Sequence, residues 1–148
     1  MFVSEKTPNC IKVYEQKNAI QHNADIGNYF ITQEKFNDLK SFEVGPNDII
    51  VSCAGTIGEL YQLPSYAKIG IINQALMKVT LYNKEISEYY KIILYDALHR
   101  LSEKSKGTAI KNIAPFDILK PAIVLVPPLN EQNRILLAIK SINQLIEY

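Results

Sequence analysis

The 148-residue sequence has few of the residues that build metal and disulfide sites. It contains two cysteines, Cys10 and Cys53, and two histidines, His22 and His99. Two cysteines are too few for a disulfide framework, and the four residues together do not form a spaced zinc motif. We therefore expect both thiols to be reduced and structural, and we predict that the chain binds no metal and no cofactor.

Long apolar runs are absent as well. No stretch approaches the ~20 apolar residues of a membrane-spanning helix, and Met1–Cys10 lacks the basic-then-apolar order of a signal peptide. The sequence therefore predicts a cytoplasmic protein that does not contact a membrane. Apolar residues make up 47% of the chain, which is typical of a globular protein, and the length is that of one domain.

Charge of one sign is also scarce, since the formal net charge is only +1. Dedicated DNA-binding proteins are often strongly basic, so the total gives no support for a nucleic-acid partner. The distribution is more informative, because acids outnumber bases seven to five in residues 1–50 and bases outnumber acids eleven to eight in the remainder. The densest basic stretch contains Arg100, Lys104, Lys106 and Lys111. These side chains would neutralise several phosphates if they shared one face, and a solvated helix end with its loop is the alternative.

Hydrophobic periodicity predicts a mixed α+β fold, a twisted mixed β-sheet with flanking helices. A helix capped by Thr32 should bury Phe36 and Leu39, and a longer helix should run from about Ser87 to Leu101, followed by a lysine-bearing loop. Short strands are expected at 11–14, 29–31, 49–51, 59–61, 69–72, 76–81 and 123–126.

A final helix should begin near Leu129 and resemble a coiled coil. Its stripe consists of Ile135, Ile139, Ile142 and Ile146, at steps of four, three and four residues. We therefore divide the chain into a domain of residues 1–126 and a helical segment of residues 127–148.

Catalytic interpretations find little support in the sequence. The loop Gly55–Gly58 lacks the Lys-Ser/Thr ending of a phosphate-binding loop, and no helix obviously follows it. A nucleophilic Cys53 or Ser52 would need an orienting base, and only the two histidines are available. We therefore predict no catalytic residue.

Three segments combine residue types that suit contact with DNA. Ser52 and Thr56 offer hydroxyl donors at a glycine loop that could approach a phosphate closely, although a plain hairpin tip explains the glycines equally. Asn73 and Gln74 interrupt a β-rich stretch; amides pair with adenine in the major groove, or satisfy backbone groups at a strand end. Around Gly107, cations for phosphates alternate with short polar groups, as in an ordinary exposed loop: Lys104, Lys106, Thr108 and Lys111.

Four stretches occur in an order that resembles one family. They are Ser52-Cys53-Ala54-Gly55-Thr56-Ile57-Gly58, then Ile72-Asn73-Gln74-Ala75-Leu76, Lys106–Ile113, and Pro127–Gln132 at the start of the last helix. Together they resemble the target recognition domain of a type I restriction–modification specificity subunit, with the start of its conserved spacer helix. The resemblance covers most of the chain, from about Ile11 to Tyr148.

The resemblance implies a non-catalytic protein that reads double-stranded DNA and directs methyltransferase and restriction–translocase subunits to their target. S-adenosylmethionine would be bound by the methyltransferase subunits. The lysines around Gly107 would then neutralise phosphates, Ser52, Thr56 and Thr108 would donate to backbone or sugar, and Asn73 and Gln74 would contact bases. The isoleucine stripe would form a subunit interface.

Two departures from the family pattern leave the form of the protein open. Complete specificity subunits carry two recognition domains joined by two antiparallel helices, whereas this sequence has one domain and a short last helix. A fragment, a truncated product and a half-subunit that forms a homodimer through the isoleucine stripe all fit this pattern. A degenerate half-subunit that binds methyltransferase without reading DNA, and a small nucleotide-binding enzyme, are the competing functions.

Overall fold

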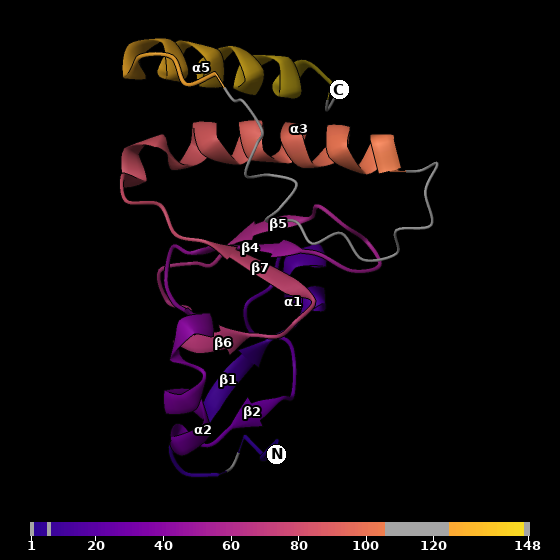
Figure 1. Cartoon of the computed structure of the whole chain (residues 1–148). Helices are drawn as coiled ribbons and strands as arrows, with labels where there is room; N and C mark the ends of the chain where they lie inside the picture. The colour runs from indigo at the N-terminus through magenta and orange to yellow at the C-terminus, as the bar shows by residue number, and fades with distance from the viewer. Residues whose placement is uncertain (1, 6, 106–124, 147–148) are drawn as a thin grey trace.

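The computed structural model describes residues 2–5, 7–105 and 125–146. Helices and strands alternate up to η1, five strands follow in succession, and the described chain ends in helices (Figure 1). The strands are β1 (Ile11–Tyr14), β2 (Phe30–Ile31), β3 (Glu43–Val44), β4 (Ile49–Ser52), β5 (Leu60–Gln62), β6 (Gly70–Ile72) and β7 (Leu76–Val79). The helices are α1 (Gln16–Ile20), α2 (Gln33–Asp38), η1 (Lys40–Phe42), η2 (Lys84–Ile86), α3 (Ser87–Ser105) and α5 (Leu129–Ile146).

The α+β class is confirmed, and the described strands divide between two sheets. A four-stranded mixed sheet has the order β2-β1-β6-β3, in which β1 and β6 are parallel and the other pairs are antiparallel. An antiparallel sheet has the order β5-β4-β7. The two sheets follow one another along the long axis of the molecule, and α3 lies over the three-stranded sheet (Figure 1).

The central strand β4 connects the core with α3. Because successive side chains of a strand point to opposite faces, β4 can pack on both sides. Ile50 packs in a cluster with Tyr14 and Leu63, whereas Ile49 and Val51 pack against Leu94 and Leu98 of α3. All three β4 residues have no exposed surface. The β-branched run that predicted a buried strand therefore contributes to two core clusters, one on each face of β4.

Helix α2 covers one face of the four-stranded sheet. Thr32 caps it, since its hydroxyl oxygen accepts a hydrogen bond from the amide of Lys35. Phe36 packs against Val13, Ile31 and Ile71. This confirms both the cap and the buried aromatic residue predicted from the sequence.

Two predicted elements differ from the structure. Helix α3 continues to Ser105, so residues 102–105 are helical and not part of a loop. Of the strand expected at 123–126, residues 123 and 124 lie outside the described residues, and Leu125 and Val126 are exposed and belong to no strand. The prediction of a strand is therefore wrong for Leu125 and Val126.

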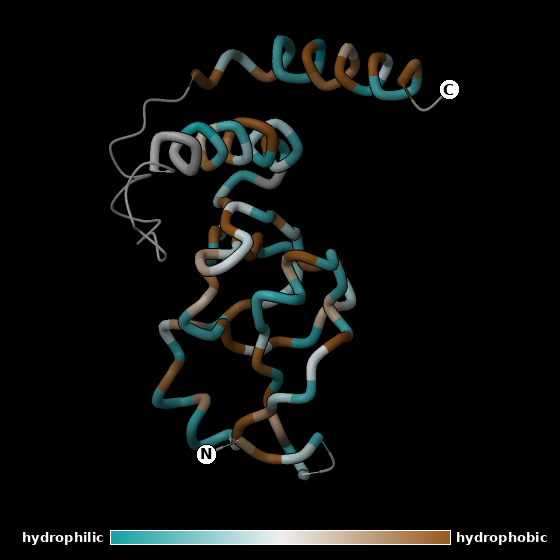
Figure 2. Tube along the Cα trace, turned by 90° about the vertical axis from the view of Figure 1, so that its right-hand side faces the viewer, coloured by the Kyte–Doolittle hydropathy of each residue, from teal (hydrophilic) through white to brown (hydrophobic). Residues whose placement is uncertain are grey.

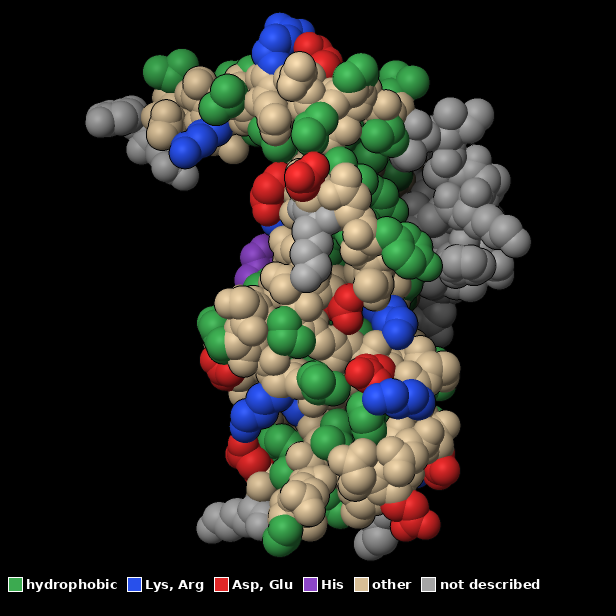
Figure 3. All heavy atoms as spheres, turned by 90° about the vertical axis from the view of Figure 1, so that its left-hand side faces the viewer, with side chains coloured by type: hydrophobic (Ala, Val, Ile, Leu, Met, Phe, Trp, Pro, Cys, Tyr) green, Lys and Arg blue, Asp and Glu red, His purple; other side chains and the backbone are tan. Residues whose placement is uncertain are grey.

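Helix α5 packs on the outer side of α3, away from the sheets (Figures 1 and 2). Its C-terminal half extends past the rest of the molecule in Figures 2 and 3. Exposure follows this arrangement: Ile135 and Ile139 are half-buried, whereas Ile142 is 54% and Ile146 is 74% exposed. No helix in the described ranges is long and apolar enough to cross a membrane.

Candidate functional site

Three separate segments meet at the carboxyl ends of the parallel strands β1 and β6. The amide of Asn73 donates to the carbonyl oxygen of Tyr14 over 3.1 Å, and the amide of Cys53 donates to that of Ala75 over 2.8 Å. Gln16 Nε2 lies 3.5 Å from the carbonyl oxygen of Thr56. We call the surface formed by Gln16, loop 53–58 and turn 73–75 the strand-end surface. It includes Thr56 and the pair Asn73 and Gln74, which were predicted to contact DNA from two separate segments of the sequence.

Loop 53–58 is a tight hairpin tip that the side chain of Ser52, at the end of β4, holds in place. Gly55 and Gly58 have positive φ angles of 62° and 94°, a conformation that glycine adopts at little cost. The hydroxyl of Ser52 donates to the carbonyl oxygen of Thr56 over 2.5 Å and accepts from the amide of Glu59 over 3.0 Å.

The two hydroxyl candidates for DNA contact therefore differ in their surroundings. Ser52 has no exposed surface, so its hydroxyl serves the loop. Thr56 is exposed at the tip and makes no side-chain hydrogen bond within the described residues. Thr56 is thus the hydroxyl that a phosphate or sugar can reach.

Turn 73–75 contains two side-chain amides: that of Asn73 stabilises the turn, and that of Gln74 faces solvent. Asn73 Oδ1 accepts a hydrogen bond from the amide of Ala75 over 3.0 Å, which fixes the turn. Gln74 is exposed, and its side chain forms no hydrogen bond with any part of the chain that the structure describes. Both residues border an apolar groove of about 320 Å³ on the α2 side of the sheet, whose walls include Val13 and Ile31.

Helix α3 packs on the same loop and carries Lys104 in its last turn. A Cβ atom added at Gly58 would lie 3.6 Å from Leu98 Cβ, so the loop packs closely on α3. Lys104 is six residues further on, ~9 Å along the helix at 1.5 Å per residue. Lys104 is in the last turn of α3, and its side chain is not described. Lys106, Thr108 and Lys111 lie outside the described residues.

Most cations on the described surface, Arg100 of the basic stretch included, are paired with carboxylates. Seven lysine or arginine side chains form ion pairs with carboxylates, at N···O distances of 3.7 Å or less. Figure 3 shows basic and acidic side chains beside one another on one face of the molecule. The paired cations are Lys17, Lys35, Lys40, Lys68, Lys91, Arg100 and Arg134. This part of the chain therefore offers little unpaired charge for phosphates.

Cys53 has the properties of a structural thiol. It is 7% exposed, and burial raises its pKa to about 11. A nucleophilic cysteine needs the opposite shift, because the thiolate is the reactive form. Among the described residues, no group of three or more His, Cys, Asp and Glu side chains is placed to hold a metal ion.

The raised pKa of Cys53 predicts an alkaline loss of stability. Its proton is held more tightly in the folded state than in the unfolded chain, where the pKa is near the usual 9.0. The free energy of unfolding should therefore fall as pH rises from 9 to about 11, relative to a Cys53→Ala variant. Urea unfolding of both proteins across this interval measures the difference, and a constant difference would contradict the assignment.

One polar segment beside these candidates was not selected from the sequence. The polar connection between β1 and β2 begins with the short helix α1, and none of its residues was predicted to contact DNA. Residues 21–29 follow α1 and return the chain to β2 at the end of the sheet where the strand-end surface lies. Polar composition was the only signal, and it does not distinguish a binding loop from a solvated one.

The chain is similar to a known protein family. The model of the family described as type I restriction modification DNA specificity domain matches residues 4–148. No curated protein matches the chain. Because the family model spans nearly the whole sequence, the chain belongs to the type I restriction–modification DNA specificity domains, and its function is to recognise DNA sequence for a restriction–modification enzyme.

Proposed function

We propose that the strand-end surface, together with residues 104–111, is where this specificity domain contacts its DNA target. The meeting of Gln16, loop 53–58 and turn 73–75 at one edge of the sheet is the observation that carries the proposal. In open α/β sheets, ligands bind outside the carboxyl ends of the strands, and this surface lies at the corresponding end of the parallel pair β1–β6. Family membership supplies the ligand, and the geometry supports the location.

Each candidate side chain has a role that its surroundings support. Gln74 is the amide for base contact, because it is exposed and makes no competing hydrogen bond in the described chain. Asn73 shapes the turn from which Gln74 projects. Thr56 donates to a phosphate or sugar, and Ser52 holds the carbonyl of Thr56 in place. Lys104, Lys106 and Lys111 neutralise phosphates, and Thr108 donates beside them.

The domain acts on DNA through partners. Specificity domains interact with DNA and with methyltransferase subunits, and the family is generally non-catalytic. We propose that this chain has no catalytic activity of its own and that restriction–translocase subunits join the assembly. In this proposal residues 1–126 recognise DNA, and residues 127–148 form the interface for assembly, including a homodimer in which α5 contacts its counterpart.

Selection of bound duplexes from a randomised DNA pool, with the methyltransferase subunit added, tests the proposed surface. The wild-type chain should enrich a short half-site, or an inverted pair of half-sites if it dimerises. Gln74→Ala should weaken preference at one base pair roughly five- to 100-fold, and Gln33→Ala on the exposed surface of α2 is the matched control. An unchanged preference in Gln74→Ala would remove the turn from the interface.

A second outcome is informative about function. A complex that forms with methyltransferase but enriches no sequence would favour the degenerate half-subunit, which binds its partner without reading DNA. Binding of ATP or S-adenosylmethionine by the isolated chain would instead indicate the nucleotide-binding alternative.

The projecting half of α5 predicts a strong effect of charge on assembly. Ile142 is 54% exposed, so replacement by aspartate should leave the domain folded. Burying the new carboxylate in an apolar interface is costly, and we expect at least about a tenfold weaker self-association or methyltransferase binding. Analytical ultracentrifugation, with and without methyltransferase, measures both.

The matched control is Asn143→Asp, which adds the same charge to an exposed neighbouring position. Ile139 is a less decisive probe, because it is half-buried where α5 packs on α3, and its loss would mix folding with assembly. Normal assembly of the Ile142 variant would show that the stripe Ile135, Ile139, Ile142 and Ile146 is not an interface.

A further inference from the structure

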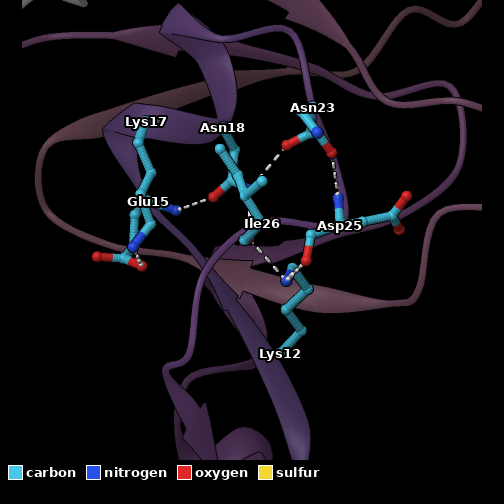
Figure 4. Close-up of polar contacts among 7 residues, drawn as sticks. All are labelled: Lys12, Glu15, Lys17, Asn18, Asn23, Asp25 and Ile26. Carbon is cyan, nitrogen blue, oxygen red and sulfur yellow. Dashed lines mark hydrogen bonds and ion pairs between the residues drawn. The ribbon is translucent and has the colours of Figure 1, made fainter.

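Two buried polar side chains fix the main chain of residues 21–29. Asn18 has no exposed surface, and its Nδ2 donates to the carbonyl oxygens of Asn23 and Ile26 over 2.9 and 2.8 Å (Figure 4). Lys12 is 6% exposed, and its ammonium donates to the carbonyl oxygens of Asp25 and Ile26 over 3.3 and 2.9 Å. We call residues 21–29 the clamped loop, because both side chains hold it from inside.

The clamp is supported by further contacts at its base. Asn18 Oδ1 accepts from the amide of Glu15 over 2.7 Å, so all of the polar atoms of this buried amide group are engaged. Asn23 Oδ1 accepts from the amide of Asp25 over 2.9 Å, which adds a local turn. The main chain of the loop therefore has one well-defined path without regular secondary structure.

Lys12 is an expensive residue to bury. Strand alternation directs it to the face opposite Val13, and in the described structure its ammonium forms no ion pair with a carboxylate. It lies 5.7 Å from the ring centroids of Tyr14 and Phe30, and burial lowers its pKa. Placing a cation there costs stability. In return, the two hydrogen bonds from Lys12 fix the positions of the carbonyl groups of Asp25 and Ile26.

The outer side of the clamped loop carries polar side chains that the clamp does not use. Gln21 and Asn28 are exposed, and neither forms a side-chain hydrogen bond within the described chain. His22 has a φ angle of 47° and stacks on Tyr61, with 5.7 Å between ring centroids and 5° between planes. Amide and imidazole groups on a rigid backbone are suited to hydrogen bonds with base edges.

The clamped loop leaves the sheet where the strand-end surface begins. The amide of Val13 donates to the carbonyl oxygen of Tyr29 over 2.9 Å, and the next residue, Tyr14, accepts from the amide of Asn73. The loop and turn 73–75 are therefore neighbours at one sheet edge. No lysine or arginine occurs in residues 21–29, so the loop would add little attraction for phosphates.

We infer that residues 21–29 are a base-reading loop, in which Gln21, His22 and Asn28 contact base edges and Lys12 and Asn18 are positioning residues. This inference rests on the proposed function and adds a second source of sequence preference beside Gln74. It separates two properties of binding. The clamped loop should determine which sequence is chosen, whereas residues 104–111 should determine how binding responds to salt.

The first experiment compares Gln21→Ala, His22→Ala and Asn28→Ala with wild type, by duplex selection in the presence of methyltransferase. At least one of the three should lose roughly five- to 100-fold of its discrimination at one base pair. Its slope of log affinity against log salt should stay that of wild type. Gln33→Ala removes an amide from the exposed surface of α2 and should change neither property.

The second experiment tests the positioning residues with a readout that general destabilisation would not give. Lys12→Met and Asn18→Ala should speed amide hydrogen exchange in residues 21–29 selectively. Both variants should also reduce the discrimination between bases at every base pair that the loop variants affect. Exchange that rises equally throughout the domain would overturn the positioning role.

The outcomes distinguish this inference from the proposed function. If wild-type protein enriches no sequence, the proposed function fails and the inference fails with it. If wild type enriches a sequence and all three loop variants enrich it with equal discrimination, only the inference is overturned. A changed salt slope in the loop variants would assign the loop to phosphate contact and would also overturn it.

Discussion

Replacement of Lys104, Lys106 and Lys111 by alanine is expected to weaken DNA binding by roughly two to three orders of magnitude at about 0.1 M salt. Each phosphate contact contributes about 0.9 to the slope of log affinity against log salt, so three lost contacts should flatten the slope by about 2.7. The structure supports a large effect, because the cations elsewhere are mostly paired with carboxylates. Sequence preference should be unchanged, since phosphate contacts carry no base information.

The matched control for the lysine variant is the triple replacement of Lys35, Lys68 and Lys91 by alanine. It removes the same charge from positions that already have a carboxylate partner, Asp38, Glu5 and Glu88 respectively. Fluorescence anisotropy over a series of salt concentrations measures both variants. Equal slopes in the two triple variants would mean that net charge alone accounts for the effect, and would remove residues 104–111 from the interface.

Gly70→Ala is expected to cost about 3 kcal/mol or more of folding free energy. Gly70 lies opposite Lys12 in the parallel pair β1–β6, and a Cβ atom there would meet the Lys12 carbonyl oxygen and the Tyr14 ring. The obstruction is main chain, so a side-chain rotation cannot relieve it. The two strands would have to separate at the amino end of β6, the opposite end from turn 73–75.

Urea unfolding measures this cost, with Gly45→Ala as the control. A Cβ atom at Gly45 would lie 3.6 Å from Ile69 Cγ1, which is ordinary contact, so that variant should retain nearly wild-type stability. Because domains of this kind have only about 5–15 kcal/mol of total stability, Gly70→Ala should lower the unfolding midpoint visibly. Equal stability of the two variants would show that β1 and β6 can separate at little cost.

Local features of the fold were predictable where one short segment decides them. Thr32 and Phe36 specify the start and the buried face of α2 without reference to distant residues. The β-branched run of β4 likewise predicts a strand in any context that buries it. The start of the last helix was predicted to within a residue, because Pro127 and Pro128 precede it and a regular apolar period follows from Ile135.

Long-range features were not predictable from periodicity. The parallel pairing of β1 with β6 joins residues more than fifty positions apart, and local patterns do not encode partners. Alternation predicts that Lys12 should face solvent, whereas the clamped loop covers that face. The extension of α3 through Lys104 was missed because polar helix ends and loops share the same residue types.

The residues of the candidate site likewise divide into those that the sequence identified and those that it could not. Thr56, Asn73 and Gln74 were selected from composition and resemblance, and the structure brings them to one surface. Ser52 was selected for its hydroxyl, but whether a hydroxyl faces outward depends on the fold of loop 53–58. Gln21, His22 and Asn28 could not be selected, because nothing in a polar run reveals that its main chain is fixed.

The clamp has a consequence for how this domain can change over evolutionary time. Lys12 and Asn18 hold the loop by carbonyl groups, which every amino acid possesses. Exposed positions such as Gln21 and Asn28 can therefore be replaced with little loss of stability. New side chains at these positions would contact the DNA from a main chain whose path is unchanged. A lineage could thus acquire a new target sequence by point substitution alone, while the framework around it stays the same.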